Sequence, residues 1–220
     1  MNKLTLASVK KELDDLKEVM TDFIKAVKPD FIVKDEPHID LSKITEIGSE
    51  VEIDLGTLRL VETNYNGQKL KCWQFKNVFK ANDLGLGLPN NSNVDGYPSA
   101  KTIHIFLEDL FNKLPNWLKE QIVEVDVPCF IPSANVIKDV KSKLFLLSAT
   151  EMCQNRYYLA REGRPLEYYI KNAPSFDNWH WLRTPDITSK TCWGVCDDNG
   201  YVGNSYTGSD RGVAPAFCTK

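Results

Sequence analysis

Five aromatic residues in the C-terminal part of the chain are the first candidates for chemistry at a surface. They lie close together in the sequence and are Trp179, Trp181, Trp193, Tyr201 and Tyr206. Tryptophan and tyrosine rings combine a large apolar face with a polar edge, which suits stacking against sugar rings or a partner's apolar surface. Aromatic rings are also the largest contributors to protein cores. The sequence therefore leaves two interpretations open for these residues, a binding platform and core packing.

The cysteines could form a disulfide or a zinc site, but their spacing argues against both. Cys192 and Cys196 are four residues apart, which on one strand is about 13 Å and too far for a disulfide. A zinc site would need two further Cys or His ligands at suitable spacing, and none is evident. For calcium the sequence offers only Pro89-Asn90-Asn91 and Asp95 in a loop, an incomplete set of oxygen ligands. We expect no metal and no cofactor.

No arrangement of residues typical of a catalytic site is evident. His38, His104 and His180 are isolated from one another, and the sequence contains no G-x-S-x-G nucleophile motif. The stretch Gly85-Leu86-Gly87-Leu88-Pro89-Asn90 fails as a dinucleotide-binding loop at its last position. We therefore predict that the protein is not an enzyme.

Composition and charge narrow the remaining classes of function. Of the 220 residues, 42% are hydrophobic and 26% are charged, which is typical of a globular protein. The net charge of −3 supplies no basic surplus for phosphate backbones and disfavours nucleic-acid binding. No run approaches the roughly 18 apolar residues of a membrane span. The N-terminus lacks the apolar stretch of a signal peptide, so we expect synthesis in a cytoplasm without membrane insertion.

A heptad pattern predicts a coiled-coil oligomerisation helix over residues 1–28. Its apolar positions alternate in gaps of three and four residues and are Leu6, Val9, Leu13, Leu16, Met20, Phe23 and Val27. Pro29 ends the helix because its ring cannot continue one. A parallel dimer prefers leucine where Val9 and Phe23 stand, which favours a trimer. The alternative is a helix that packs on its own domain, since such a wide apolar stripe also suits a globular surface.

The rest of the chain predicts a linker or arm over residues 29–47 and an α+β domain over residues 48–220. Short antiparallel strands are expected at residues 51–55, 58–61, 71–75, 143–148, 192–196, 200–203 and 212–217. Helices are expected among them, at residues 103–123 and over part of 149–170. Asn66-Gly67 and Asp197-Asp198-Asn199-Gly200 are hairpin signals, and residues 82–99 are a long surface loop.

Two C-terminal motifs resemble those of a known family. They are Trp179-His180-Trp181-Leu182-Arg183-Thr184-Pro185 and Arg211-Gly212-Val213-Ala214-Pro215-Ala216-Phe217. Together they resemble the W-L-R-[ST]-P and G-V-R-P-A-[FL] motifs of uncharacterised domains in gut bacteria and their phages. The strand 143–148 and the residues up to Glu151 look like the L-L-S-x-x-E segment of that family. Ala214 stands where the family has arginine, which removes any role of that arginine here.

The resemblance implies a variant of the C-type-lectin-like fold, which formylglycine-generating enzymes and several phage receptor-binding proteins share. In such domains the W-L-R-[ST]-P segment is mostly structural, so we expect Arg183 to hold a buried carboxylate or backbone carbonyls. Formylglycine-generating enzymes use a reactive cysteine pair. A cysteine-dependent oxidase therefore stays open as an alternative, with Cys192, Cys196 and Cys218 in the corresponding region.

These observations lead to a hypothesis for the function. We expect a non-enzymatic structural protein of a virion, a head or tail fibre or decoration protein at the virion surface. A homotrimeric stalk would display recognition domains that adhere to a host-surface glycan or protein, and other virion proteins would be its further partners. Besides the oxidase, the remaining alternative is a domain with a purely architectural role and no ligand.

Overall fold

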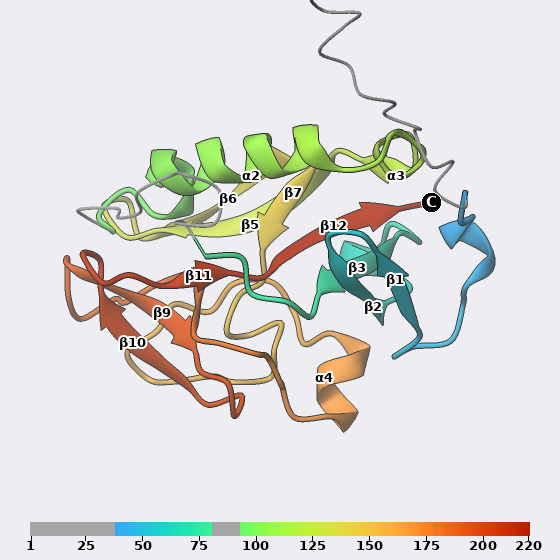
Figure 1. Ribbon diagram of the computed structural model, residues 1–220. Coiled ribbons are helices and arrows are strands. Elements are labelled where there is room, and N and C mark those ends of the chain that lie inside the picture. Colours follow the sequence, from blue (N-terminus) through green and yellow to red (C-terminus); the bar gives the residue numbers. More distant parts are fainter. Residues whose placement is uncertain (1–37, 81–92) are drawn as a thin grey trace, which may run out of the picture. The chain divides into compact units, whose positions relative to one another are not determined.

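The computed structural model describes residues 38–80 and 93–220, which form a mostly β domain (Figure 1). Strands account for 36% of the residues and helices for 18%. The chain divides at His38, and Ile39–Lys220 form the compact unit to which all the elements below belong. The described strands make a six-stranded sheet, a four-stranded sheet and a two-stranded hairpin.

The six-stranded sheet is built around the last strand of the chain, β12 (Pro215–Thr219). Its strand order is β1 (Glu50–Ile53), β2 (Gly56–Glu62), β3 (Lys71–Phe75), β12 and β4 (Ile122–Val123), and β7 (Leu144–Leu146) also pairs with β12. One edge of β12 meets β3, and the other edge is shared by β7 and β4. All residues of β12 are buried, so this strand is the centre of the core.

The four-stranded sheet carries the aromatic residues singled out above. Its order is β10 (Val202–Tyr206), β9 (Cys192–Cys196), β8 (His180–Pro185) and β11 (Gly212–Val213). β8 and β11 are parallel, and the other neighbours are antiparallel. The separate hairpin consists of β5 (Val125–Ile131) and β6 (Val136–Ser142).

The helices are few and short apart from α2 (Lys101–Lys113). In Figure 1, α2 runs along β5 and β7, and it buries one face through Ile103, Phe106, Leu107 and Leu110. The spacing of these residues is that of an amphipathic helix. The other α-helices are α3 (Asn116–Lys119) and α4 (Glu167–Lys171). Single turns of 3₁₀-helix occur at η1 (Leu41–Lys43), η2 (Tyr65–Gly67) and η4 (Tyr97–Ser99).

The structure overturns the predicted fold class. The α+β, C-type-lectin-like prediction is wrong, because the described domain is mostly β-sheet, in several sheets and with few helices. Residues 149–170 were expected to be partly helical, and the helix within this range is confined to α4, which begins at Glu167, whereas residues 149–166 consist of turns and extended segments. Cys153 there has a φ of 58°, which a right-handed helix does not allow. The hairpin of β5 and β6 supplies strands that the sequence did not predict.

The two predictions for the N-terminal part of the chain, a coiled-coil helix and a linker, have different outcomes. The coiled-coil helix over residues 1–28, with all of its heptad positions, lies outside the described residues, and no coiled-coil helix is evident within 38–80 and 93–220. The end of the predicted linker packs on the domain. Leu41 is fully buried, and its N–H donates a hydrogen bond of 2.8 Å to the side chain of Gln121.

A buried ion pair connects all three sets of strands. Arg183 in β8 is fully buried and donates hydrogen bonds of 2.5 and 2.7 Å to the two carboxylate oxygens of Glu151. Its guanidinium also donates to the carbonyl of Leu146 in β7, at 2.8 Å, and to that of Pro128 in β5, at 3.1 Å. Tyr65 completes the site by donating its hydroxyl to Glu151 at 3.0 Å. The predicted role of Arg183 is confirmed.

A second carboxyl group, that of Glu162, lies beside this pair and is fully buried. It accepts hydrogen bonds from the N–H of Phe130, at 2.6 Å, and from the hydroxyl of Thr184, at 3.2 Å. Burial raises the pKa of Glu162 to about 8, although the charge of Arg183 acts in the opposite direction. Glu162 is therefore mostly protonated in the folded domain at neutral pH.

Replacement of Arg183 by methionine tests the buried ion pair. Arg183→Met leaves the carboxylate of Glu151 buried without its cation, and we expect the free energy of unfolding to fall by about 3–5 kcal/mol. The double variant Arg183→Met/Glu151→Gln removes both charges and should be more stable than the single variant. Urea denaturation of the three proteins measures this. A single variant within about 1 kcal/mol of the wild type would contradict the role given to Arg183.

The pH dependence of stability tests the state of Glu162. Its pKa in the folded domain is raised from 4.5 to about 8, so the folded state holds this proton more tightly than the unfolded chain does. The resulting stabilisation is complete below pH 4.5 and is lost as the pH rises towards 8. Glu162→Gln cannot titrate, so it should lose less stability than the wild type over this interval. Urea denaturation at several pH values measures the free energy of unfolding of both proteins. If the two plots of this free energy against pH run parallel, the expectation is wrong.

Candidate functional site

The five predicted aromatic residues divide into a core group and an exposed group. Trp181 and Trp193 are buried, with 4% and 1% of their surface exposed, and both pack in the main hydrophobic core. Trp179, Tyr201 and Tyr206 are exposed by 39%, 59% and 61%. A surface platform can therefore use only the second group.

Trp179 and Tyr201 come together at one end of the four-stranded sheet. His180 in β8 and Val202 in β10 pair with the same residue of β9. One position further along, Trp179 and Tyr201 lie on either side of Asp197, whose N–H donates to the carbonyl of Tyr201 at 3.0 Å. Their backbones are thus two strand spacings apart, about 10 Å.

The turn between β9 and β10 fixes the position of Tyr201. A side-chain oxygen of Asp197 accepts hydrogen bonds from the N–H of Asn199, at 3.0 Å, and of Tyr201, at 2.8 Å. Gly200 has a φ of +80°, and a Cβ atom there would lie 2.1 Å from the carbonyl oxygen of Pro174. Only glycine fits this position without strain. The predicted hairpin turn is confirmed.

An arginine stacks on each of the two rings. The guanidinium carbon of Arg211 lies 4.7 Å from the centre of the Trp179 ring, and that of Arg156 lies 4.5 Å from the centre of the Tyr201 ring. Arg156 is also held by its Nε, which donates to the carbonyl of Val202 at 2.8 Å. Each cation–π contact favours one arrangement of both side chains. Trp179, Tyr201, Arg156 and Arg211 are called the arginine–aromatic row below.

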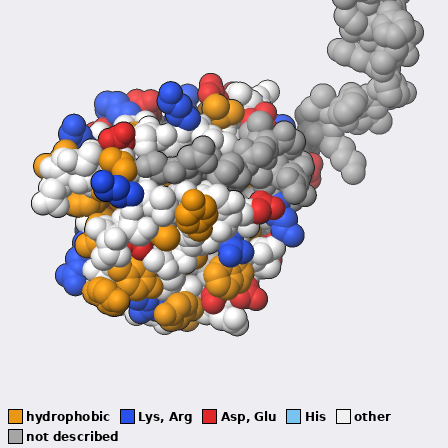
Figure 2. All heavy atoms as spheres, turned by 90° about the vertical axis from the view of Figure 1, so that its left-hand side faces the viewer, with side chains coloured by type: hydrophobic (Ala, Val, Ile, Leu, Met, Phe, Trp, Pro, Cys, Tyr) orange, Lys and Arg blue, Asp and Glu red, His pale blue; other side chains and the backbone are white. Residues whose placement is uncertain are grey.

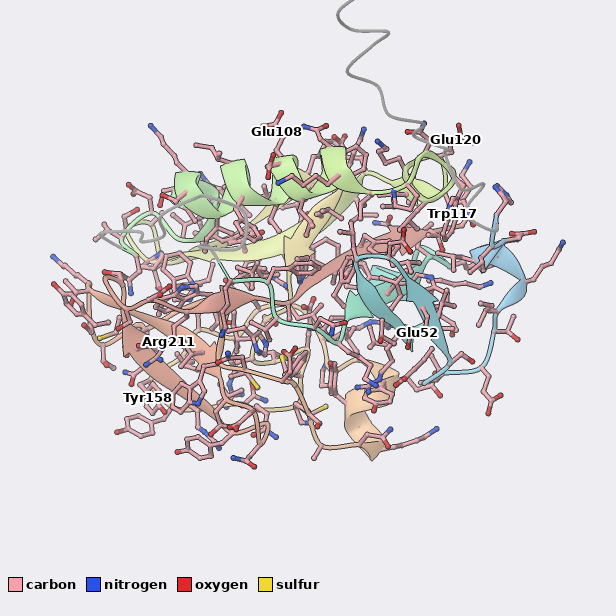
Figure 3. The ribbon with its side chains drawn as sticks, viewed as in Figure 1. Glu52, Glu108, Trp117, Glu120, Tyr158 and Arg211 are labelled. Atoms are coloured by element: carbon pink, nitrogen blue, oxygen red, sulfur yellow. The ribbon has the colours of Figure 1, made fainter. Side chains whose placement is uncertain are left out.

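Further apolar side chains extend this surface beyond Tyr201. Tyr157 is exposed by 89% and meets the ring of Tyr158 edge-on, at 5.1 Å between ring centres. Burial, and next the neighbouring Tyr201, raise the pKa of Tyr158. Figure 3 shows Tyr158 and Arg211 on the same side of the domain. Figure 2 looks onto this side and shows separate hydrophobic patches over its lower part, with basic side chains among them.

Tyr206 does not belong to the row. It ends β10, whereas Tyr201 precedes that strand, and five residues of extended chain separate the two by about 16 Å. Its ring lies close to Gly208 instead. Of the predicted aromatic residues, the structure brings together Trp179 and Tyr201.

A pocket of about 210 Å³ lies next to the row. Its walls combine one aromatic ring with charged and polar groups and consist of Lys80, Asn178, Trp179, Asp210, Arg211 and Gly212. Among the described residues, the Nε of Arg211 is buried and has no hydrogen-bond partner. The stack on Trp179, rather than a set of hydrogen bonds, therefore positions this guanidinium.

The cysteines lack the features of a reactive pair. All six are free, and Cys192 and Cys196 are the two ends of β9. Burial raises the pKa of Cys196 to about 12, which keeps the thiol protonated at neutral pH, whereas a reactive cysteine needs a lowered pKa. Cys218 is buried in β12 opposite Cys72. This environment gives the oxidase alternative no support.

Metal and membrane sites were also predicted to be absent. Within residues 38–80 and 93–220, no three His, Cys, Asp or Glu side chains are grouped so that they could hold a metal ion. Of the calcium candidates, Asn90 and Asn91 lie outside the described residues, and Asp95 accepts a hydrogen bond from Ser133. In the described part of the chain, no helix is long and apolar enough to cross a membrane.

A family model for DUF6273, a domain of unknown function, matches residues 88–220. The chain belongs to the DUF6273 family. This confirms the predicted membership in a family of uncharacterised domains. No curated protein and no solved structure matches the chain. The DUF6273 region includes the whole arginine–aromatic row, whereas β1 to β3 and Lys80 precede it.

Sequence reasoning missed both arginines of the row. Arg156 is 45 positions from Tyr201, and the stack between them depends on the path of the turns that follow Glu151. Arg211 is the first residue of a motif stretch that was noted, but no binding role was given to it, since its contact with Trp179 follows from the parallel pairing of β11 with β8. Neither contact has a local sequence signal.

Substitution of Gly200 tests how the turn positions Tyr201. Gly200→Ala adds a Cβ atom that collides with the carbonyl of Pro174 at a left-handed φ, and we expect a loss of about 1–3 kcal/mol in the free energy of unfolding. Gly67→Ala is the matched control, because Gly67 has a φ of +76° and open space where its Cβ would be. Urea denaturation should show the larger loss for Gly200→Ala, and equal losses would argue against the close packing of this turn.

Proposed function

We propose that this DUF6273 domain is a non-enzymatic recognition module that binds glycans through the arginine–aromatic row. The observation that carries the proposal is the pair of exposed rings, Trp179 and Tyr201, set about two strand spacings apart and each stacked by an arginine. Exposed aromatic rings with a few convergent polar groups are typical of ligand sites. Core packing does not account for them, since both rings remain well exposed.

The arrangement suits a short oligosaccharide. The apolar C–H faces of two sugar rings would lie against Trp179 and Tyr201, where burial of apolar surface stabilises the complex. Sugar hydroxyl groups need hydrogen-bond partners at the same time. Arg156 and Arg211, each stacked on one of the rings, supply donors for them.

The nature of the surface favours a glycan over a protein as the ligand. A stable protein interface buries about 800 Å² on each partner around a well-packed apolar centre. On the side viewed in Figure 2, the hydrophobic side chains form separate patches with polar and basic groups between them. Separate rings with hydrogen-bonding groups between them match a chain of sugar rings better than a continuous apolar interface.

We further propose that this recognition serves adhesion to a host surface, from a fibre or decoration protein of a virion. The resemblance of the W-L-R-T-P and G-V-A-P-A-F motifs to domains of gut bacteria and their phages supports this setting. A homo-oligomer held by other virion proteins would present several weak sites at once, which raises avidity by roughly 10²–10⁴.

Alanine variants of the exposed aromatic residues test the glycan proposal. Glycan-array screening of the full chain would identify a ligand, and calorimetry would then compare variants. We expect Trp179→Ala and Tyr201→Ala each to weaken binding about tenfold, through the lost stacking and burial. Tyr206→Ala is the matched control, because Tyr206 is equally exposed on the same sheet but outside the row, and it should bind like the wild type.

Binding to whole cells with treated surfaces separates a glycan from a protein ligand. Binding to whole cells should be lost after periodate oxidation of surface sugars and should survive protease treatment. The reverse pattern would refute the glycan proposal in favour of a protein ligand. A Tyr206→Ala variant that binds as weakly as Tyr201→Ala would remove the row as the binding site.

A further inference from the structure

The pocket beside Trp179 has a charge pattern that a neutral sugar does not require. Lys80 and Arg211 line it together with a single acidic side chain, that of Asp210. Within the described part of the chain, none of the ion pairs includes Lys80, Arg211 or Asp210. The lining therefore carries one net positive charge, and neither of its cations is paired with a carboxylate of the described residues.

The position of Arg211 suits the recognition of a carboxylate. Its guanidinium stacks on the Trp179 ring, and a stacked guanidinium uses its flat face while its N–H donors point outward along its edge. Its terminal Nη groups donate no hydrogen bond to another described residue, so no group in this part of the chain occupies these donors. Two parallel N–H donors match the two oxygens of a carboxylate.

The other lining groups fit the remainder of a sugar. The side-chain oxygen of Asn178 accepts the N–H of Trp179 at 2.8 Å, which leaves its amide N–H₂ to donate to a hydroxyl or ring oxygen. Asp210 supplies acceptors for hydroxyl groups. Trp179 is 39% exposed, so part of its ring stays available for stacking while Arg211 covers another part.

We propose that this pocket binds the carboxylate of an acidic sugar, as one residue of the glycan held by the arginine–aromatic row. The inference rests on the proposed glycan function and specifies its ligand class. Arg211 receives the carboxylate as a bidentate partner, Lys80 adds a second positive charge, and Trp179 packs against the sugar ring. The bound sugar is of the uronic acid type, with one negative charge and several hydroxyl groups.

A carboxylate fits this pocket better than a sulfate or a phosphate. A single negative charge balances the one net positive charge of the lining. A phosphate carries close to two charges and would be repelled more strongly by the carboxylate of Asp210. A planar two-oxygen group also matches the fork of a single guanidinium, whereas a tetrahedral anion leaves further oxygens for which the lining has fewer donors.

Matched sugars test the inference on the full chain. Calorimetry would compare oligosaccharides that end in glucuronic acid, in glucose and in a sulfated glucose but are otherwise identical. We expect the glucuronic acid probe to bind about tenfold more tightly than the glucose probe, and the difference to shrink in high salt. Arg211→Gln should remove this difference, because it weakens binding of the glucuronic acid probe far more than binding of the glucose probe, which loses only a neutral hydrogen-bond donor. Lys80→Gln should reduce the difference in part.

Arg156→Gln is the matched control, because Arg156 stacks on Tyr201 as Arg211 stacks on Trp179 but lies outside the pocket. It should preserve the preference for glucuronic acid. Three results would overturn the inference: equal binding of the acidic and neutral probes, a preference for the sulfated probe, or an equal effect of Arg211→Gln on both sugars. Each of them would leave the glycan proposal standing. Failure of all three probes and of the wider array to bind would overturn both.

Discussion

Arg183 carries a positive charge into a part of the core from which water is excluded, and Glu151 neutralises it through two hydrogen bonds of 2.5 and 2.7 Å. A charge buried in this way costs several kcal/mol unless its partners are in place. Those partners come from the turn after β7, from β7 itself through Leu146 and from β5 through Pro128. The six-stranded sheet, the hairpin and the four-stranded sheet must therefore assemble together, because each completes the same site.

The candidate site depends on this anchor through β8. Arg183 lies near one end of the strand, and Trp179 immediately precedes the other end. The three residues between them are buried, and His180 and Trp181 pair with both β9 and β11, so the backbone next to Trp179 is fixed by the core. A ligand then meets a preformed surface and loses little entropy by ordering it. The arginine stacks serve the same end, since they restrict two long side chains without hiding their donors.

The sequence predicted local features better than tertiary ones. Short-range rules predicted strands within residues 51–61 and turns at Asn66-Gly67 and Asp197–Gly200. The corresponding strands and turns are present. The partial helix expected within 149–170 could not be placed more closely, because the form of residues 149–166 depends on distant partners, such as the hydrogen bond from Ser148 to the carbonyl of Glu162. The fold class was wrong for the same reason, because the balance of helix and strand is set by these long-range contacts.

Burial explains why the aromatic residues could not be sorted from the sequence. Trp179 and Trp181 are two positions apart, yet one is 39% exposed and the other 4%. Trp181 lies within β8 and is paired with both β9 and β11, whereas Trp179 precedes the strand. A local pattern does not show where a strand begins to be covered by its neighbours, so the exposure of Trp179 could not be predicted.

The mixture of charges around the row limits the kind of anion that it can hold. The chain as a whole is acidic, with a net charge of −3, and this end of the sheet carries the cations Arg156, Arg211 and Lys80. Asp197 and Asp210 lie among these cations. A polyanion such as a nucleic acid would place a phosphate near each acid as well as near each cation, and repulsion would offset the attraction. A mostly uncharged chain with an isolated carboxylate meets a cation at one point and hydrogen-bonding groups elsewhere. The same acids that weaken the surface for a polyanion therefore serve as acceptors for sugar hydroxyl groups.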